Sequence, residues 1–484
     1  MAKRKRENAA RPGAARPAKA RKAAAPDRGP DAEPLTVHIV TGSYERVLHG
    51  FAATVPRSLM AASRARAQHA AEEPTVHFTD TFLFTAHASA IRCLALSPRS
   101  DDTSKVVLAT GGTDERINLY SLSTAPPAMS ALRPKLPSLH GASITENPKN
   151  KELGTLLHHA SNITALHFPS RSKLLSAAED STVAITRTRD WTVLSTIKAP
   201  IPTPQGRPSG DTAGPGEVPS GVNDFAMHPS NKLMLTVGKG EKCMRLWNML
   251  TGKKAGVLNF GREILTAVGE GRFGSGEGRR VVWDREGEEF AVAFERGVVV
   301  FNMDCKVKTK IAPTPRTKIH QMRYLPSELH ASLLLVSTED GRVLVYDTSK
   351  STSPASEEGT RKATKDDFPS SQLVAQIGGP GAGISGRVKD FEILSLPDST
   401  YLIVTGSSDG TVRTWSLNTT DMEKQDNAEG EGFTAKPVGT LLATYKTGTR
   451  ITCLTAFIMS GTADAEEEDE IAENKEASSS DDSE

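Results

Sequence analysis

One pattern recurs along this 484-residue chain and constrains its fold more than any other feature. An apolar run is followed by small residues, an acidic turn and a second β-rich run, and an aromatic residue or its substitute stands six positions after the acid. A repeat of this kind indicates structural units that bury their apolar faces against one another. Clear copies lie at residues 106–121, 174–186, 333–347 and 401–416.

Each copy of the pattern predicts a β-hairpin. Turn pairs such as Asp340-Gly341 and Asp409-Gly410 tolerate the positive φ angles of tight turns. The run before the turn is apolar on both faces, which is typical of a strand buried between neighbouring sheets. The run after it alternates between apolar and polar residues. A further short strand precedes each hairpin, at residues 91–98, 163–168, 222–229, 319–325 and 388–393.

Two more hairpins are degenerate and bring the count of units to six. Residues 233–248 carry one extra residue in the turn, and residues 289–301 form a tight hairpin without the Asp. Residues 36–53 form a hairpin with no preceding strand, and residues 450–457 form a strand with no following hairpin. Together these two fragments make a seventh unit that closes a ring and removes open sheet edges. We therefore expect an all-β, seven-bladed β-propeller over residues 35–458.

The spacers and the two ends of the chain lie outside this pattern. We expect disordered tails at residues 1–34 and 459–484. Residues 1–30 carry a net charge of +8, and residues 461–484 carry a net charge of −10. Five spacers are rich in Pro, Ser and Gly, and we expect long surface loops there. They lie near residues 124–153, 201–220, 262–279, 349–371 and 418–436.

The repeats resemble WD repeats, including a Gly-His element that survives as Ala86-His87 and His158-His159. In that family a His, a strand Ser or Thr, the turn Asp and the Trp form a structural hydrogen-bond relay. Tyr120 and Thr186 stand in the place of the Trp, and the blade with Trp415 lacks the His. The resemblance implies relay positions at His87, Thr110, Asp114, His159, Ser176, Asp180, Asp340, Thr405, Asp409 and Trp415.

The resemblance extends beyond the repeat. Residues 40–51, 157–168, 175–180, 388–390 and 450–454 resemble the p21-activated-kinase-interacting protein family, known in fungi as a maintenance-of-killer WD protein. This likeness covers residues 36–457. It implies a scaffold in the nucleolar assembly of the large (60S) ribosomal subunit and in rRNA processing. Its partners would be pre-60S ribosomal proteins and assembly factors, and it could also contact rRNA. It would act as a monomer within a larger complex. The alternative is a signalling adaptor that binds and negatively regulates a p21-activated-type protein kinase.

The same residues argue against an enzyme. The turn acids Asp114, Asp180, Asp340 and Asp409 recur once per blade, so we assign them to turns rather than to catalysis. No phosphate-binding or nucleophile motif is present, and we expect no cofactor. We expect no metal site, because His158 and His159 would point to opposite faces of a strand. The cysteines show no paired spacing, and no apolar run is long enough to cross a membrane. They are Cys93, Cys243, Cys305 and Cys453.

Two sets of basic residues are candidate functional sites. Lys3, Arg4, Lys5 and Arg6 are a candidate nuclear import signal, with RNA contact or a solvated tail as alternatives. We expect a nuclear, nucleolar protein. Arg387, Lys389 and Arg450 stand at strand entrances and are candidate partner-binding residues, although each could be an ordinary solvated charge. We place the recognition surface on these entrance loops, near His87 and His159.

Overall fold

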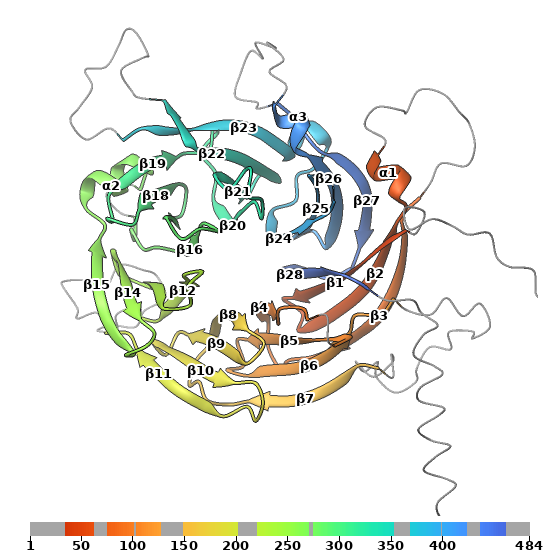
Figure 1. Cartoon of the computed structure of the whole chain (residues 1–484), viewed down its shortest axis with the longest axis horizontal. Coiled ribbons are helices and arrows are strands. Elements are labelled where there is room, and N and C mark those ends of the chain that lie inside the picture. The colour runs from red at the N-terminus through yellow and green to blue at the C-terminus, as the bar shows by residue number, and fades with distance from the viewer. Residues whose placement is uncertain are drawn as a thin grey trace, which may run out of the picture. The chain divides into compact units, whose positions relative to one another are not determined.

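The computed structural model describes residues 34–61, 75–100, 103–126, 149–201, 220–270, 274–352, 368–397, 399–423 and 436–460. Nearly all of the regular structure is β-strand, which confirms the expected fold class (Figure 1). The described ranges also contain the short helices α1 (Arg57–Ala61), α2 (Arg262–Ala267) and α3 (Thr419–Glu423), and η4 (Pro380–Ala382) is a single 3₁₀ turn. No helix in the described part of the chain is long and apolar enough to cross a membrane.

The strands form because short β-rich runs alternate with tight turns at Asp, Gly and Ser. The strand before each acidic turn is buried along nearly its whole length, as in Leu333–Thr338 and Thr400–Ser407. The strands are β1 (Leu35–Ser43), β2 (Val47–Val55), β3 (His77–Thr85), β4 (Ile91–Leu96), β5 (Lys105–Gly112), β6 (Ile117–Ser123), β7 (Lys151–Leu156), β8 (Ile163–Ser170), β9 (Lys173–Ala178), β10 (Thr182–Arg187), β11 (Val193–Lys198), β12 (Val222–Met227), β13 (Leu233–Gly238), β14 (Cys243–Asn248), β15 (Lys253–Asn259), β16 (Arg280–Trp283), β17 (Glu289–Ala293), β18 (Val298–Asn302), β19 (Val307–Ile311), β20 (Ile319–Tyr324), β21 (Leu333–Thr338), β22 (Arg342–Thr352), β23 (Ser370–Gly378), β24 (Val388–Ser395), β25 (Thr400–Ser407), β26 (Thr411–Asn418), β27 (Thr440–Lys446) and β28 (Ile451–Ile458).

The described strands build seven four-stranded antiparallel blades. Five of them are separate sheets, and two are joined through one parallel pair, Lys310 and Ser370, between β19 and β23. In six blades the strand that comes first in the sequence lies innermost, and in the closing blade β28 takes this place. These inner strands contact one another in the order β28, β4, β8, β12, β16, β20, β24 and back to β28. The blades therefore form a closed ring around a central opening (Figure 1).

The closing blade combines strands from both ends of the described chain. Its order is β28-β1-β2-β3, so residues 36–53 and 450–457 lie in one sheet. Val37 pairs with Ile458 at one end of the β1–β28 ladder, and Gly42 pairs with Cys453 near the other. A Cβ at Gly42 would lie 2.7 Å from Cys453 Sγ. The absence of a side chain at this position is therefore what lets the two strands approach.

Several spacers contain more regular structure than the sequence analysis expected. The spacer 262–279 begins with α2, and the spacer 418–436 contains α3. The spacer 349–371 is shortened at both ends by β22 and β23, and β7 begins inside the spacer 124–153. Strand β3, the fourth strand of the closing blade, was not anticipated. Most of the spacer 201–220 and both charged tails, with Lys3, Arg4, Lys5 and Arg6, lie outside the described residues.

Closure of the ring by β28 gives the first prediction. A chain that ends at Gly448 lacks β28 and leaves β1 as an open, apolar sheet edge. We expect this chain to be insoluble or to melt on the order of 10 °C lower than the parent. A chain that ends at Ser460 keeps β28 and is the matched control. Thermal unfolding of both variants tests the claim, and equal melting temperatures would show that β28 is dispensable.

Candidate interaction surface and its hydrogen-bond relay

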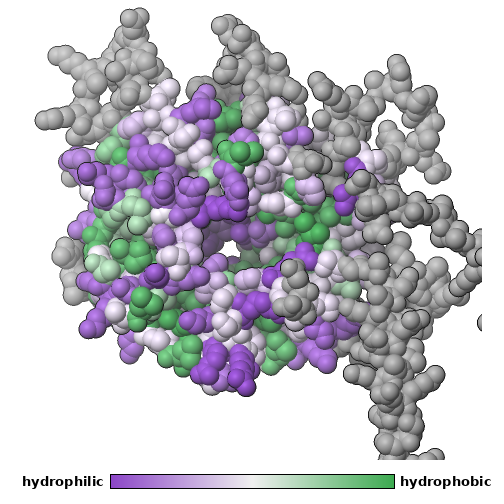
Figure 2. All heavy atoms as spheres, viewed as in Figure 1, coloured by the Kyte–Doolittle hydropathy of each residue, from purple (hydrophilic) through white to green (hydrophobic). Residues whose placement is uncertain are grey.

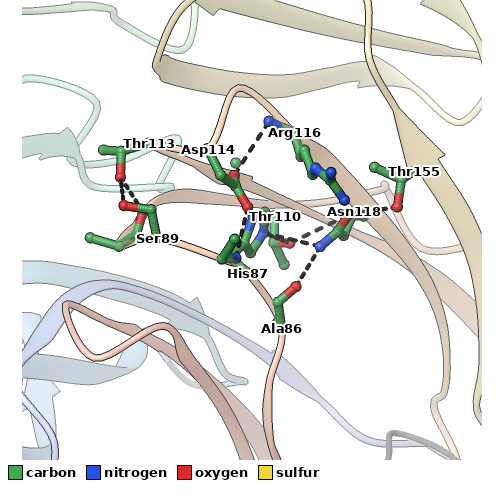
Figure 3. Close-up of polar contacts among 12 residues, drawn as sticks. Ala86, His87, Ser89, Thr110, Thr113, Asp114, Arg116, Asn118 and Thr155 are labelled. Carbon is green, nitrogen blue, oxygen red and sulfur yellow. Dashed lines mark hydrogen bonds and ion pairs between the residues drawn. The ribbon is translucent and has the colours of Figure 1, made fainter.

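In the blade β4–β7, the loop before β4 is held by His87 (Figure 3). His87 Nδ1 donates a hydrogen bond to the Asp114 carboxylate at 2.9 Å, and its Nε2 lies 2.7 Å from the Thr110 hydroxyl. The Ala88 backbone N–H donates to the same carboxylate at 2.9 Å. These bonds connect the entrance loop to the β5–β6 turn and to strand β5. The relay thereby fixes the loop at the inner end of the blade.

Asn118 extends this relay, and the sequence analysis did not identify it. Its side-chain amide donates to the Ala86 carbonyl at 2.6 Å, and it accepts a hydrogen bond from the Thr155 hydroxyl at 2.7 Å (Figure 3). The relay therefore reaches β7, the outermost strand. Tyr120, in the place of the Trp, packs edge-on against Phe84 with the ring centroids 5.7 Å apart. The available signal was a polar Asn inside the apolar run 117–122.

The next blade, β8–β11, repeats the arrangement with different partners. His159 Nδ1 donates to the Asp180 carboxylate at 3.0 Å, and its Nε2 lies 2.8 Å from the Ser176 hydroxyl. Thr186, in the place of the Trp, is buried, and its hydroxyl has no hydrogen-bond partner among the described residues. The sequence analysis was wrong about His158. It lies in a loop rather than on a strand, and its ring is tilted by 45° against that of His159, with the centroids 4.5 Å apart.

The protonation states of the relay groups suit a structural role. Burial lowers the pKa of His87, so this imidazole is neutral at physiological pH. Burial opposes ionisation of the Asp114 carboxyl, but hydrogen bonds from His87 and from the Ala88 amide outweigh it and lower its pKa. The same balance, with His159 and Thr182 as donors, lowers the pKa of Asp180. Both carboxylates therefore act as permanent hydrogen-bond acceptors.

Three other blades replace the His with an Arg. Asp340 pairs with Arg342 at 2.6 Å, and Asp409 pairs with Arg413 at 3.5 Å. In the third, Glu241 pairs with Arg245. Where the Trp is present, its indole N–H donates to the strand Thr: Trp415 to Thr405 at 3.3 Å and Trp247 to Thr236 at 2.8 Å. The available signal for two of these arginines was an Arg two positions before the Trp.

The relay gives the second prediction. Asp114 accepts hydrogen bonds at both oxygens, from His87, Ala88 and Arg116. In Asp114→Asn the amide nitrogen must face a donor, so we expect a loss of about 1–3 kcal/mol in the free energy of unfolding. Glu115→Gln removes the same charge from an exposed neighbour and should change it by less than about 0.5 kcal/mol. Denaturant unfolding measures both variants, and equal stabilities would contradict a structural relay.

At one end of the central opening, the entrance loops surround a cavity of about 810 Å³, which we call the mouth. Ala88, Ser89 and Ala90, in the loop that His87 holds, form part of its wall. A space-filling view shows the hollow at the centre of the ring bordered largely by hydrophilic residues (Figure 2). Glu179 and Glu277 also line the mouth. The cations that line it are Arg46, Arg92, Arg279, Arg280, Lys389 and Arg450.

The structure brings two of the three candidate partner-binding residues together. Lys389 and Arg450 both line the mouth, from β24 and from the residue before β28. Burial, reinforced by Arg387 and Arg450, lowers the pKa of Lys389. Arg387 does not line the mouth and forms an ion pair with Glu339 at 3.1 Å. His87 and His159 are buried, so they support the surface and are not part of it.

Below the mouth, the inner strands enclose a second cavity of about 630 Å³ that is lined by paired charges. Arg323 lies 3.7 Å from Asp390 and 3.3 Å from Glu392. Asp390 also accepts the Leu454 backbone N–H at 3.0 Å, which links β24 to the closing strand β28. Because these carboxylates are already bound to neighbouring side chains and backbone groups, their geometry is that of a structural network.

The remaining reactive groups of the described residues do not assemble a catalytic or metal site. Burial raises the pKa of the Cys93 thiol to about 12, so it stays protonated and is a poor nucleophile. Cys453 is buried, and burial raises its pKa as well. Within the described ranges, no three His, Cys, Asp or Glu residues lie close enough to hold a metal ion.

Comparison with known proteins relates the chain to one repeat family and to a set of full-length proteins. The WD domain, G-beta repeat family matches residues 78–121, 150–186 and 384–416. Protein MAK11 of Saccharomyces cerevisiae is 27% identical over 436 residues, which cover 86% of this chain and 82% of the relative. The p21-activated protein kinase-interacting protein 1-like of Danio rerio is 26% identical over 433 residues, covering 89% and 83%. Shk1 kinase-binding protein 15 of Schizosaccharomyces pombe is 30% identical over 129 residues, covering 27% and 31%.

Proposed function

We propose that this chain, a WD40-repeat protein related over most of its length to MAK11 and the p21-activated protein kinase-interacting proteins, is a non-catalytic scaffold in the nucleolar assembly of the 60S ribosomal subunit. The observation that carries the proposal is the likeness to MAK11 over 86% of the chain. In this role the chain binds pre-60S ribosomal proteins and assembly factors, contacts rRNA, and acts as a monomer within a larger complex.

The physical chemistry of the ring supports a docking role. A closed propeller presents loops from several blades on one face, and the relays hold at least two of these loops in place. A preformed surface loses little conformational entropy when it binds, which favours affinity. The cations of the mouth attract anionic groups, which are abundant in rRNA and in acidic protein segments.

A second candidate function is a signalling adaptor that binds and negatively regulates a protein kinase. It is favoured by the names of the relatives, which describe kinase-interacting and kinase-binding proteins. Affinity purification of the tagged chain separates the two functions. Recovery of pre-ribosomal RNA with large-subunit proteins supports the scaffold, and recovery of a kinase without them supports the adaptor.

The mouth gives the third prediction. Lys389→Glu combined with Arg450→Glu reverses two cations of the mouth, and we expect the variant to fold but to lose most co-sedimentation with pre-ribosomal particles. The control is Lys253→Glu with Lys254→Glu, which reverses two exposed charges on the outer strand β15. Sucrose-gradient sedimentation measures association, and thermal melting checks folding. If the folded variant co-sediments like the parent, the partner binds elsewhere on the ring.

The basic tail gives the fourth prediction. Replacing Lys3, Arg4, Lys5 and Arg6 with Ala removes the densest run of cations in the first 30 residues, and we expect nuclear accumulation to fall. The control replaces four isolated cations of the same segment, Arg11, Arg16, Lys19 and Arg28. Imaging of tagged chains compares the variants. Nuclear signal that is unchanged in the first variant would place the import determinant elsewhere.

A further inference from the structure

Cations from separate blades converge on the mouth. Arg46 lies in the β1–β2 turn, Arg92 in β4, Arg280 in β16 and Lys389 in β24, and Arg450 immediately precedes β28. All five side chains line the same cavity. Because the inner strands stand around a common axis, these charges surround the cavity instead of following one line across it. They are far apart in the sequence, and only ring closure brings them together.

This positive charge is only partly balanced by the protein. Among the described residues, the side chains of Arg46, Arg92, Lys389 and Arg450 form no ion pair with a carboxylate, whereas Arg280 lies 3.7 Å from Asp224. The backbone N–H of Arg450 donates to the Glu45 carboxylate at 2.9 Å, and its guanidinium lies over the Tyr44 ring, 5.6 Å from the centroid. The two acidic residues of the mouth are engaged elsewhere. Glu179 pairs with Lys239 at 3.5 Å. Glu277 accepts the Gly240 backbone N–H at 2.8 Å.

His320, in β20, adds an unsatisfied polar group to the same cavity. Its Nε2 is buried and has no hydrogen-bond partner within the described part of the chain. Burial, reinforced by Lys389 and Arg387, lowers the pKa of His320 to about 4. The imidazole is therefore neutral at physiological pH and can donate or accept a hydrogen bond. An anion in the mouth would neutralise the crowded cations and give this ring a partner.

We propose that the mouth binds a compact polyanion that carries several phosphate groups around a small core, such as an inositol polyphosphate. Its phosphates would face the cations of β4, β16, β24 and the closing blade at the same time. An extended acidic peptide or an RNA strand would cross the mouth in one direction and reach fewer of them. The cavity of about 810 Å³ lies within the range of small-molecule sites, about 300–1,000 Å³.

The bound polyanion extends the proposed scaffold function and uses part of the same surface. It would connect the entrance loops of several blades at the surface where the partner docks. Ligand binding to the folded state alone stabilises that state in proportion to the logarithm of ligand concentration. The melting temperature of the chain should therefore rise with added polyanion.

The experiment titrates the full-length chain with inositol hexakisphosphate in a calorimeter at about 0.15 M salt, where weak charge contacts are screened. We expect saturable one-to-one binding and a higher melting temperature. Lys389→Glu with Arg450→Glu should weaken binding at least about tenfold, and His320→Ala should weaken it less. Lys253→Glu with Lys254→Glu should leave it unchanged. Replacing Lys3, Arg4, Lys5 and Arg6 with Ala should also leave it unchanged, which separates the mouth from the basic tail.

Three results would overturn the proposal. The first is the absence of saturable binding, or equal binding by the parent and the mouth variant. The second is hexaglutamate or oligouridylate binding as tightly as inositol hexakisphosphate, which would mark a peptide or RNA surface. The third is binding to vesicles that contain a phosphoinositide without binding to the soluble ligand. If the mouth variant loses particle association but the parent chain does not bind polyphosphate, this inference alone is refuted. Polyphosphate binding by a chain that never associates with pre-ribosomal particles refutes the scaffold function alone.

Discussion

The antiparallel pairing of β28 with β1 is the interaction on which the rest of the structure depends. It joins segments more than 400 residues apart, from Val37–Ile458 to Ser43–Ile451. Without it β24 and β4 would lose their common neighbour, since β28 contacts both. The pairing needs Gly42, because a side chain there would meet Cys453. Asp390 reinforces the closure by accepting the Leu454 N–H. Ring closure thus rests on a sheet ladder, one close backbone approach and one buried carboxylate.

The inner ends of the blades then fix the surface on which the proposed function depends. In two blades a His–Asp hydrogen bond holds the entrance loop, and in three others an Arg–acid pair occupies the turn. Each pair is local to one blade, and in three blades it reaches the entrance loop, through His87, through His159 and through the bond from Arg342 to the Thr314 carbonyl. The entrance loops and inner strands of several blades together line the mouth. Its cations come from blades that share only their position around the ring, and therefore the charge pattern is a property of the closed propeller.

Much of the fold could be predicted from the sequence, because turn chemistry and β-rich runs are local signals. Asp409-Gly410 and the apolar run before it identify a hairpin without knowledge of the rest of the chain. Strand β3 was not predicted because its sequence, His77–Thr85, mixes polar and aromatic residues. The strand also lies at the partly exposed outer position of its blade. The helices α2 and α3 were not predicted because they are short and lie in polar spacers.

The candidate site was predictable only in part. Asp114 follows from the repeat pattern and His87 from the resemblance to WD repeats, but Asn118 and Arg342 depend on which side chain reaches across the blade. The sequence places Arg387 and Arg450 at equivalent positions, immediately before an inner strand, but in the structure Arg387 pairs with Glu339, and Lys389 lines the mouth with Arg450. Their meeting with Arg92 and His320 depends on the closed ring, which brings distant strands to one axis.

Hydrogen exchange of the backbone amides in β28 tests the central claim, a ring closed by that strand, most directly. If β28 closes the ring, the amides of residues 452–457 should exchange only through global unfolding, with the same protection as those of the inner strands β4 and β24. The protection of these amides should fall in parallel with that of the amides in β4 and β24 as denaturant is added. Exchange of β28 at much lower free energy than β4 and β24, while those strands stay protected, would contradict the account.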